Sequence, residues 1–183
     1  MTSISDIRHI GKDIFAVLGE LACKFASLEF AMSEILARLV YPENPYIVDI
    51  LTPSLPFSAK IDRIKKFSNI RLQNNRLKSQ LHEFIKDAEK ARQKRNFFIH
   101  GLWKFDEKKI KQGKIECSDY VWKIPNEKQH PTRLPEQTFT IDELLSYADI
   151  IGELVTLGFR IVQELDSTAM IRNHIKPLKI NIE

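Results

Sequence analysis

Apolar residues recur every three or four positions along the first part of the chain, which is the spacing of one face of an α-helix. The apolar row comprises Ile14, Leu18, Leu21, Phe25, Leu28, Met32, Ile35 and Leu39. A second row beside it comprises Phe15, Ala22, Glu29 and Leu36, of which Glu29 is the charged exception. The two prolines of the segment 41–45 end the pattern. We therefore expect a long amphipathic helix that ends near residue 41.

Two further helical patterns follow a break at Pro53-Ser-Leu-Pro56. The first has apolar positions at Phe57, Ile61, Ile64 and Phe67 and should end between residues 69 and 75. The second row comprises Leu77, Leu81, Phe84, Ala88, Ala91, Arg95, Phe98 and Leu102. Arg95 is its only charged member, at a position where a core residue is expected.

The pattern changes to short alternations between Trp103 and Ile124, where Gly113 favours a turn. This predicts a small β-hairpin, followed by a proline-containing loop over residues 125–137. Thr140-Ile-Asp-Glu143 has the spacing of a capping box, which starts a helix by satisfying its first backbone donors. The helix carries two apolar rows, so it is either central to a bundle or part of a dimer interface. These rows are Ile141, Leu144, Ala148, Ile151, Val155, Gly158, Val162 and Leu165, and Tyr147, Ile150, Leu154, Leu157 and Ile161.

Together these patterns predict an all-α fold: an antiparallel helical bundle of four main helices with a small β-hairpin insertion at about 103–138. The length of 183 residues and the hydrophobic content of 43% suit a single domain over residues 1–183. We expect no membrane association, because neither a signal-peptide pattern nor an uninterrupted apolar span is found. Two cysteines without metal spacing favour a cytoplasmic protein, in which Cys23 is a packing residue.

Positive charge is concentrated in the middle of the chain. Residues 60–114 contain 17 Lys and Arg against 6 Asp and Glu, a net charge of +11, although the whole chain carries only +4. Such a concentration attracts polyanions, of which nucleic acid is the commonest in a cell. A solvated, lysine-rich helix face explains the charge equally well. The same two interpretations apply to Lys108, Lys109, Lys111 and Lys114 in the predicted hairpin.

Candidate chemistry is confined to the end of the third predicted helix. The sequence contains no glycine-rich phosphate loop, no Cys/His metal cluster and no nucleophile-elbow serine. Arg92, Asn96 and His100 are spaced four apart and share one helix face, with Arg95 beside them. A histidine can move a proton to or from a ribose hydroxyl, and an arginine can hold a phosphate. The structural alternative is a helix end with polar residues and adjacent aromatic residues, which has no activity.

The segment Arg95-Asn-Phe-Phe-Ile-His100 resembles the Arg-x4-6-His signature of the HEPN superfamily, with a polar residue directly after the arginine. The Leu28-Glu29 pair in the first helix and the LPFSAKID segment before the motif helix are also similar to that group. The resemblance covers roughly Phe15 to Leu165, but only the motif of six residues is specific.

The resemblance implies a dimeric helical domain that is often a metal-independent endoribonuclease of toxin–antitoxin or defence systems. It implies His100 as acid and base, Arg95 as phosphate ligand and Asn96 as polar helper, with no cofactor. We add Arg92, Glu29, Lys94 and Trp103 as candidate binding residues, although an aromatic such as Trp103 is more often part of the core. The implied partners are a second copy of the chain, RNA or a nucleotide, and an antitoxin protein.

One departure from the family concerns position 102. Members paired with nucleotidyltransferase antitoxins often carry tyrosine two residues after the histidine, where this chain has Leu102. Regulation by modification of that tyrosine is therefore not expected.

A geometrical difficulty remains, because Arg95 and His100 are five residues apart and point about 140° apart on a regular helix. Either the helix loosens before Gly101 or a second subunit supplies the missing group, and we favour the second. A buried arginine needs an anion nearby, and Glu29 is the candidate within the chain, although it also suits a partly exposed position without a partner. The rival functions are a non-catalytic module that binds a nucleotide, RNA or protein, and a purely structural helix end.

Overall fold

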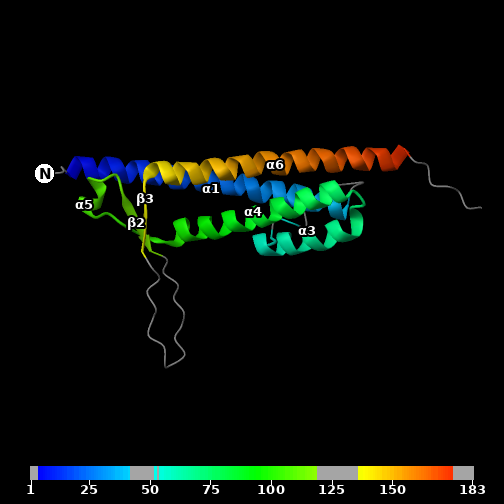
Figure 1. The fold of residues 1–183 in the computed structure, drawn as a ribbon, viewed down its shortest axis with the longest axis horizontal. Coiled ribbons are helices and arrows are strands. Elements are labelled where there is room, and N and C mark those ends of the chain that lie inside the picture. The colour runs from blue at the N-terminus through cyan, green and yellow to red at the C-terminus, as the bar shows by residue number, and fades with distance from the viewer. Residues whose placement is uncertain (1–3, 42–51, 53, 119–135, 175–183) are drawn as a thin grey trace, which may run out of the picture. The chain divides into compact units, whose positions relative to one another are not determined.

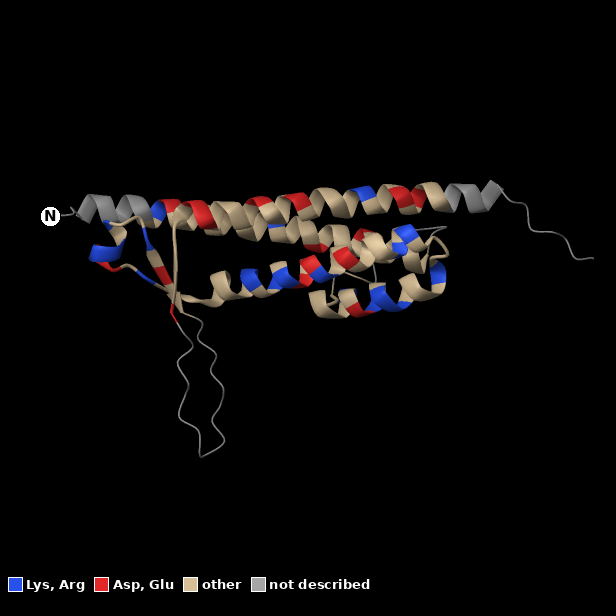
Figure 2. Ribbon diagram, viewed as in Figure 1, with Lys and Arg blue, Asp and Glu red and all other residues tan. Residues whose placement is uncertain are grey.

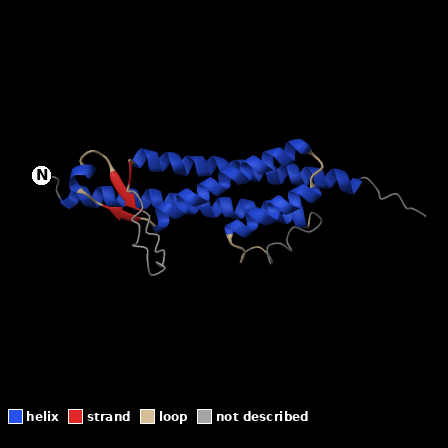
Figure 3. Cartoon of the chain, turned by 60° about the horizontal axis from the view of Figure 1, so that its bottom comes forward, coloured by secondary structure: helices blue, strands red, loops and turns tan. Residues whose placement is uncertain are grey.

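The computed structural model describes residues 4–41, 52, 54–118 and 136–174, and helices dominate them (Figures 1 and 3). The helices are α1 (Ile4–Val40), α3 (Phe57–Arg71), α4 (Asn75–His100), the short α5 (Glu107–Ile110) and α6 (Ile141–His174). The strands β1 (Leu102–Lys104), β2 (Ile115–Ser118) and β3 (Gln137–Phe139) form one small sheet. The prediction of an all-α fold with a small hairpin insertion is therefore confirmed.

Residue contacts divide the chain into two compact units. The first unit contains residues 1–26 and 90–153, and the second contains residues 27–89 and 154–183. The helices α1, α4 and α6 each contribute one part to each unit. The two units are described separately below.

The core of the second unit is built from the apolar rows of four helices. Its buried residues include Leu28, Met32, Ile35, Leu39, Ile61, Ile64, Leu77, Leu81, Phe84, Ala88, Ile161, Val162 and Leu165. Gly158 lets α6 pack closely, because a Cβ atom there would lie 3.0 Å from Cβ of Ala31 and 3.2 Å from the Phe84 ring. The predicted rows of α1, α3, α4 and α6 thus face one another here, as their helical spacing requires.

Helix directions in the second unit differ in part from the predicted antiparallel bundle. Phe30 contacts Phe159, and further along both helices Arg38 bonds Asp166, so α1 and α6 run parallel here. By contrast, Phe84 lies beside Gly158 while Leu77 shares a cavity with Gln163, so α4 runs antiparallel to α6. The directions of α4 and α6 thus agree with an antiparallel bundle, whereas those of α1 and α6 do not.

The first unit contains the sheet. β1 pairs with β2 antiparallel, with Trp103 opposite Cys117, which confirms the predicted hairpin. Its connection contains α5 and Gly113, whose φ of 68° is a left-handed conformation that favours glycine. β3 also pairs with β2, with Phe139 opposite Ile115, although the sequence placed residue 137 in a loop. Residues 119–135 of the predicted insertion lie outside the described residues.

The predicted capping box is present at the start of α6. The backbone N–H of Glu143 donates to Oγ1 of Thr140 at 3.1 Å, and the backbone N–H of Thr140 donates to the Glu143 carboxylate at 2.8 Å. Two donors at the helix start are thereby satisfied reciprocally, which fixes where α6 begins.

Lys24 links α1 to α6 within the first unit. Its Nζ atom lies 2.7 Å from Glu20 and 3.1 Å from Asp149. The hydrogen bonds to these carboxylates, first that to Glu20, raise the pKa of Lys24 above its ordinary value of 10.5. A raised lysine pKa stabilises the folded state while the lysine is charged, so this contribution persists at neutral pH and is lost only in strongly alkaline solution.

Some apolar positions predicted to be covered are exposed in the single chain. Phe15 in the second row of α1 is 66% exposed, and Ile150 in the second row of α6 is 49% exposed. Cys23 is also exposed, so its assignment as a packing residue is wrong for the single chain. Each of these residues lies off the main apolar row of its helix, and one helix face is enough to cover the core. In the described part of the chain, no helix is both long and apolar enough to cross a membrane.

Candidate nucleic-acid cleavage site

Arg95 lies on the buried face of α4, as its place in the apolar row predicted. The neighbouring members of that row, Ala91 and Phe98, are 8% and 1% exposed, while Arg95 is half-buried. Its guanidinium carbon lies 5.4 Å from the centre of the Phe25 ring on α1, a cation–π distance. One terminal nitrogen donates to Oδ1 of Asn96 at 3.1 Å. The guanidinium is thus held in place by a ring and by the side-chain amide that follows it.

The charge of Arg95 is not compensated within the described residues. There, no carboxylate forms an ion pair with it, and its buried Nε atom has no hydrogen-bond partner. A buried donor without a partner costs about 1–3 kcal/mol. Such an arrangement is unfavourable unless another group, such as an anion or a second polypeptide, completes it.

His100 is the last residue of α4 and is exposed. Helix α4 remains α-helical through His100, so loosening of the helix before Gly101 does not occur in this structure. On a regular helix the two side chains therefore point about 140° apart. Arg95 contacts the core of its unit while His100 faces solvent, and the helix geometry does not bring them together in one chain.

The end of α4 is fixed by side chains from the sheet. The last four carbonyls of a helix have no partner within it. The indole N–H of Trp103 donates to the carbonyl of Phe98 at 2.9 Å, and Sγ of Cys117 lies 3.8 Å from the carbonyl of Phe97. Both donors come from the β1–β2 pair, so the hairpin positions the helix end that carries His100.

An aromatic cluster surrounds this helix end. Phe98 contacts Trp103, Phe139 and Tyr147, with ring centres 6.0, 5.1 and 5.4 Å away. Trp103, a candidate binding residue, thus packs against Phe98, and its indole N–H donates to a carbonyl at the end of α4. Lys94, another candidate, lies with Nζ 5.2 Å from the centre of the Tyr147 ring. Arg92 is half-buried on the same helix.

Glu29 has a different partner from the one considered for it. Its carboxylate accepts from Nζ of Lys60 on α3 at 3.0 Å. Lys60 is only 3% exposed, so this pair neutralises a buried ammonium group inside the second unit. Arg95 has Asn96 and Phe25 as its partners instead. The role of Lys60 was missed, although its position directly before Ile61 in the apolar row of α3 places it at the edge of the buried face.

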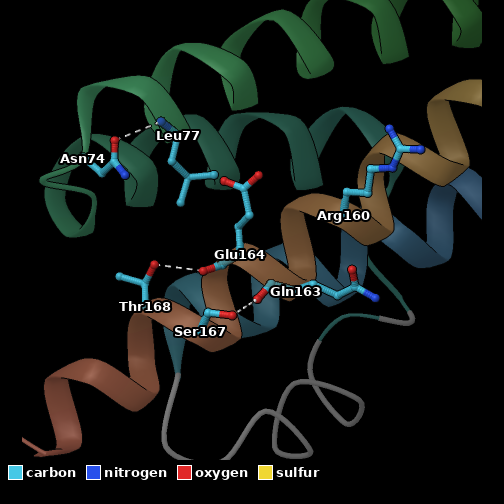
Figure 4. A pocket seen from close by; sticks show the side chains of 7 residues that line it. All are labelled: Asn74, Leu77, Arg160, Gln163, Glu164, Ser167 and Thr168. Carbon is cyan, nitrogen blue, oxygen red and sulfur yellow. Dashed lines mark hydrogen bonds between the residues drawn. The ribbon is translucent and has the colours of Figure 1, made fainter.

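The second unit also contains a cavity of about 410 Å³ that the sequence did not predict (Figure 4). Its lining comprises Asn74, Leu77, Arg160, Gln163, Glu164, Ser167 and Thr168. The hydroxyls of Ser167 and Thr168 donate to backbone carbonyls one helical turn earlier, at 2.9 and 2.8 Å. Arg160 and Glu164 contribute opposite charges. The cavity therefore favours no particular sign of charge, and its hydroxyl protons are already used by the helix.

The remaining chemistry of the described residues is limited. In these residues, no three His, Cys, Asp or Glu side chains are grouped as metal ligands would be.

No family model, curated protein or solved structure matches this chain. The resemblance to the HEPN superfamily therefore depends on the motif of residues 95–100 and its helical setting.

Proposed function

We propose that this protein is a metal-independent endoribonuclease of a toxin or defence type, which cleaves RNA in a cleft shared by two copies of the chain. The observation that carries the proposal is Arg95, a half-buried cation without a carboxylate partner among the described residues. Asn96 and Phe25 orient it, and exposed His100 follows on the same helix. A phosphodiester carries the negative charge that balances the positive charge of the Arg95 guanidinium.

The chemistry needs only the groups of this cluster. The ribose 2′-oxygen attacks the adjacent phosphorus, and the bond from phosphorus to the 5′-oxygen breaks. His100 takes the proton from the 2′-hydroxyl and then gives it to the leaving 5′-oxygen, so the same proton is removed at one end and returned at the other. Arg95 holds the phosphate and stabilises the charge that develops on it, while Asn96 fixes the guanidinium. The products are a cyclic phosphate end and a 5′-hydroxyl end.

The proposal requires a second copy of the chain because of the helix geometry. A regular α4 directs Arg95 and His100 to different sides, so one phosphate cannot contact both groups of one chain. Pairing Arg95 of one chain with His100 of another removes this conflict. A symmetric dimer would then contain two identical clefts.

The test compares two histidines of the same helix. Purified wild-type protein should cleave mixed RNA in the presence of a chelator, and His100→Ala should reduce the rate by about 100-fold or more. His82→Ala is the matched control, because His82 is also exposed on α4, and it should retain wild-type activity. Equal activity of wild type and His100→Ala would refute the assignment of His100. RNA binding without cleavage by the wild type would instead indicate the non-catalytic binding module.

A further inference from the structure

One stretch of the second unit is strongly basic and lacks acidic residues. From Arg63 to His82 the chain contains no Asp or Glu, but it contains six Lys and Arg. This stretch includes most of α3, the turn after it and the first turns of α4. We call the exposed cations of this stretch the α3–α4 basic surface: Arg63, Lys65, Lys66, Arg71 and Arg76.

The basic surface differs from the buried lysine on the same helix. Lys60 is covered and paired with Glu29, so its charge is already neutralised. Arg63, Lys65 and Lys66 are exposed, and within the described residues no carboxylate forms an ion pair with them. Their positive charge therefore remains available to a ligand from solution.

Several other cations of the described residues have acidic neighbours instead. In the hairpin, Lys109 pairs with Glu116 and Lys111 pairs with Glu107. In the helices, Arg38 pairs with Glu34 and Asp166. Figure 2 shows the acidic residues interspersed along α1 and α6, whereas Lys and Arg prevail on α3. In the described part of the hairpin, Lys104, Lys109 and Lys111 thus lie beside carboxylates. Arg63, Lys65 and Lys66 of the α3–α4 basic surface form no such ion pair with the described residues.

The side chains between these cations suit a nucleic acid. Asn69, Gln73 and Asn75 are exposed amides, which can hydrogen-bond to phosphates, sugars and base edges. Ile70 is 76% exposed and follows Arg63 and Lys66 on one helix face. An anionic lipid surface would require a broader apolar face than a single isoleucine. Repeated cations with amides between them match a flexible polyanion that carries hydrogen-bonding groups.

We propose that the α3–α4 basic surface binds the backbone of single-stranded RNA. This surface lies in the second unit, whereas the Arg95 cluster lies in the first, and it shares no residue with that cluster. The binding proposed for it does not depend on cleavage, so it stands or fails independently of the proposed nuclease activity.

The experiment measures RNA affinity at a series of salt concentrations. All proteins carry His100→Ala, so that the RNA, a fluorescently labelled oligouridylate, is not cleaved. The test variant replaces Arg63, Lys65 and Lys66 by Gln, which is a good helix former. The control variant replaces Lys86, Lys104 and Lys111 by Gln, which removes the same charge from lysines that pair with Glu83, Glu136 and Glu107.

The test variant should bind RNA at least about tenfold more weakly at low salt, and its log–log salt slope should fall by about 2, since each single-strand phosphate contact contributes about 0.7. The control should change the slope by less than about 1. Equal losses in both variants would overturn the proposal, as would a folded test variant with unchanged affinity. The proposal would also be overturned if polyglutamate displaced the labelled RNA as effectively as unlabelled RNA does, because the surface would then bind any polyanion.

The two proposals can fail separately. Loss of binding only in the α3–α4 variant, without cleavage by the wild type, would support this surface and refute the nuclease. The converse result is cleavage of RNA by the wild type that depends on His100, together with an unchanged RNA affinity of the α3–α4 variant. This result would support the nuclease activity and refute RNA binding by the α3–α4 basic surface.

Discussion

Gly101 separates His100 from the sheet, and the structure leaves no space for a side chain there. A Cβ atom at this position would lie 2.5 Å from the carbonyl oxygen of Phe97 and would also overlap Sγ of Cys117. The same two groups form the contact that fixes the end of α4. Gly101 thus permits the close approach of β2 to the helix that carries the candidate motif.

Gly101→Ala should destabilise the protein by about 1–3 kcal/mol, because the added methyl group must displace backbone and buried sulfur atoms. Gly19→Ala is the control: a Cβ atom there meets nothing within 4 Å on an exposed helix face. It should stabilise the protein by about 0.5–1 kcal/mol. Urea unfolding measures both changes. A Gly101→Ala variant as stable as Gly19→Ala would show that the helix end is not packed as described.

Single residues also show which features of the candidate site could be predicted from the sequence. Arg95 and Glu29 stand out because each interrupts an apolar row, and periodicity detects such interruptions. Periodicity does not identify their partners. Glu29 pairs with Lys60, 31 residues away, and Phe25 lies against Arg95 from a different helix. Candidate site residues could therefore be predicted, but not the contacts that position them.

At the scale of elements, local patterns were predicted well and long-range pairings were not. The capping box of α6 and the β1–β2 hairpin depend on residues close in sequence, and both are present. β3 has only three residues and forms because β2 offers a free edge next to it. The parallel arrangement of α1 and α6 in the second unit is likewise a long-range feature, which no helical spacing encodes.

The Glu29–Lys60 pair links α1 to α3, and its charge balance should stabilise that contact. Glu29→Ala should lower the free energy of unfolding by up to about 3 kcal/mol, because it leaves the buried Lys60 ammonium without a partner. Replacing Lys60 by Met in the same protein should recover most of the loss, since no buried charge then remains. Urea unfolding of the two single variants and the double variant gives the coupling.

Glu83→Ala is the control for this cycle. Glu83 pairs with Lys86 at 3.9 Å on the surface, where both side chains are well exposed. Its removal should change stability by less than about 0.5 kcal/mol. If Glu29→Ala were equally harmless, the buried lysine would have to be neutral or hydrated, and the pair would not hold α1 and α3 together.

At the scale of the whole molecule, the proposed activity is a property of two chains. Within the described residues Arg95 has no carboxylate partner, and His100 points to a different side of the same helix, so one chain alone does not bring together the two groups of the proposed site. A symmetric dimer would contain two sites, each with Arg95 from one copy and His100 from the other. The mass of one chain is 21.3 kDa. Light scattering should therefore give twice this mass at micromolar concentration, and a monomer mass would contradict the shared cleft.

Mixing two inactive variants tests the shared cleft directly. Arg95→Ala and His100→Ala should each lack RNA cleavage as homodimers. After unfolding and refolding together in equal amounts, about half of the dimers should contain one chain of each kind. In each mixed dimer, one of the two clefts receives an intact Arg95 from one chain and an intact His100 from the other. The mixture should therefore recover about a quarter of the wild-type cleavage rate. A site formed within one chain predicts no recovery, because every chain of the mixture lacks one of the two groups. Refolding each variant alone and then combining them without further exchange is the control, and it should remain inactive.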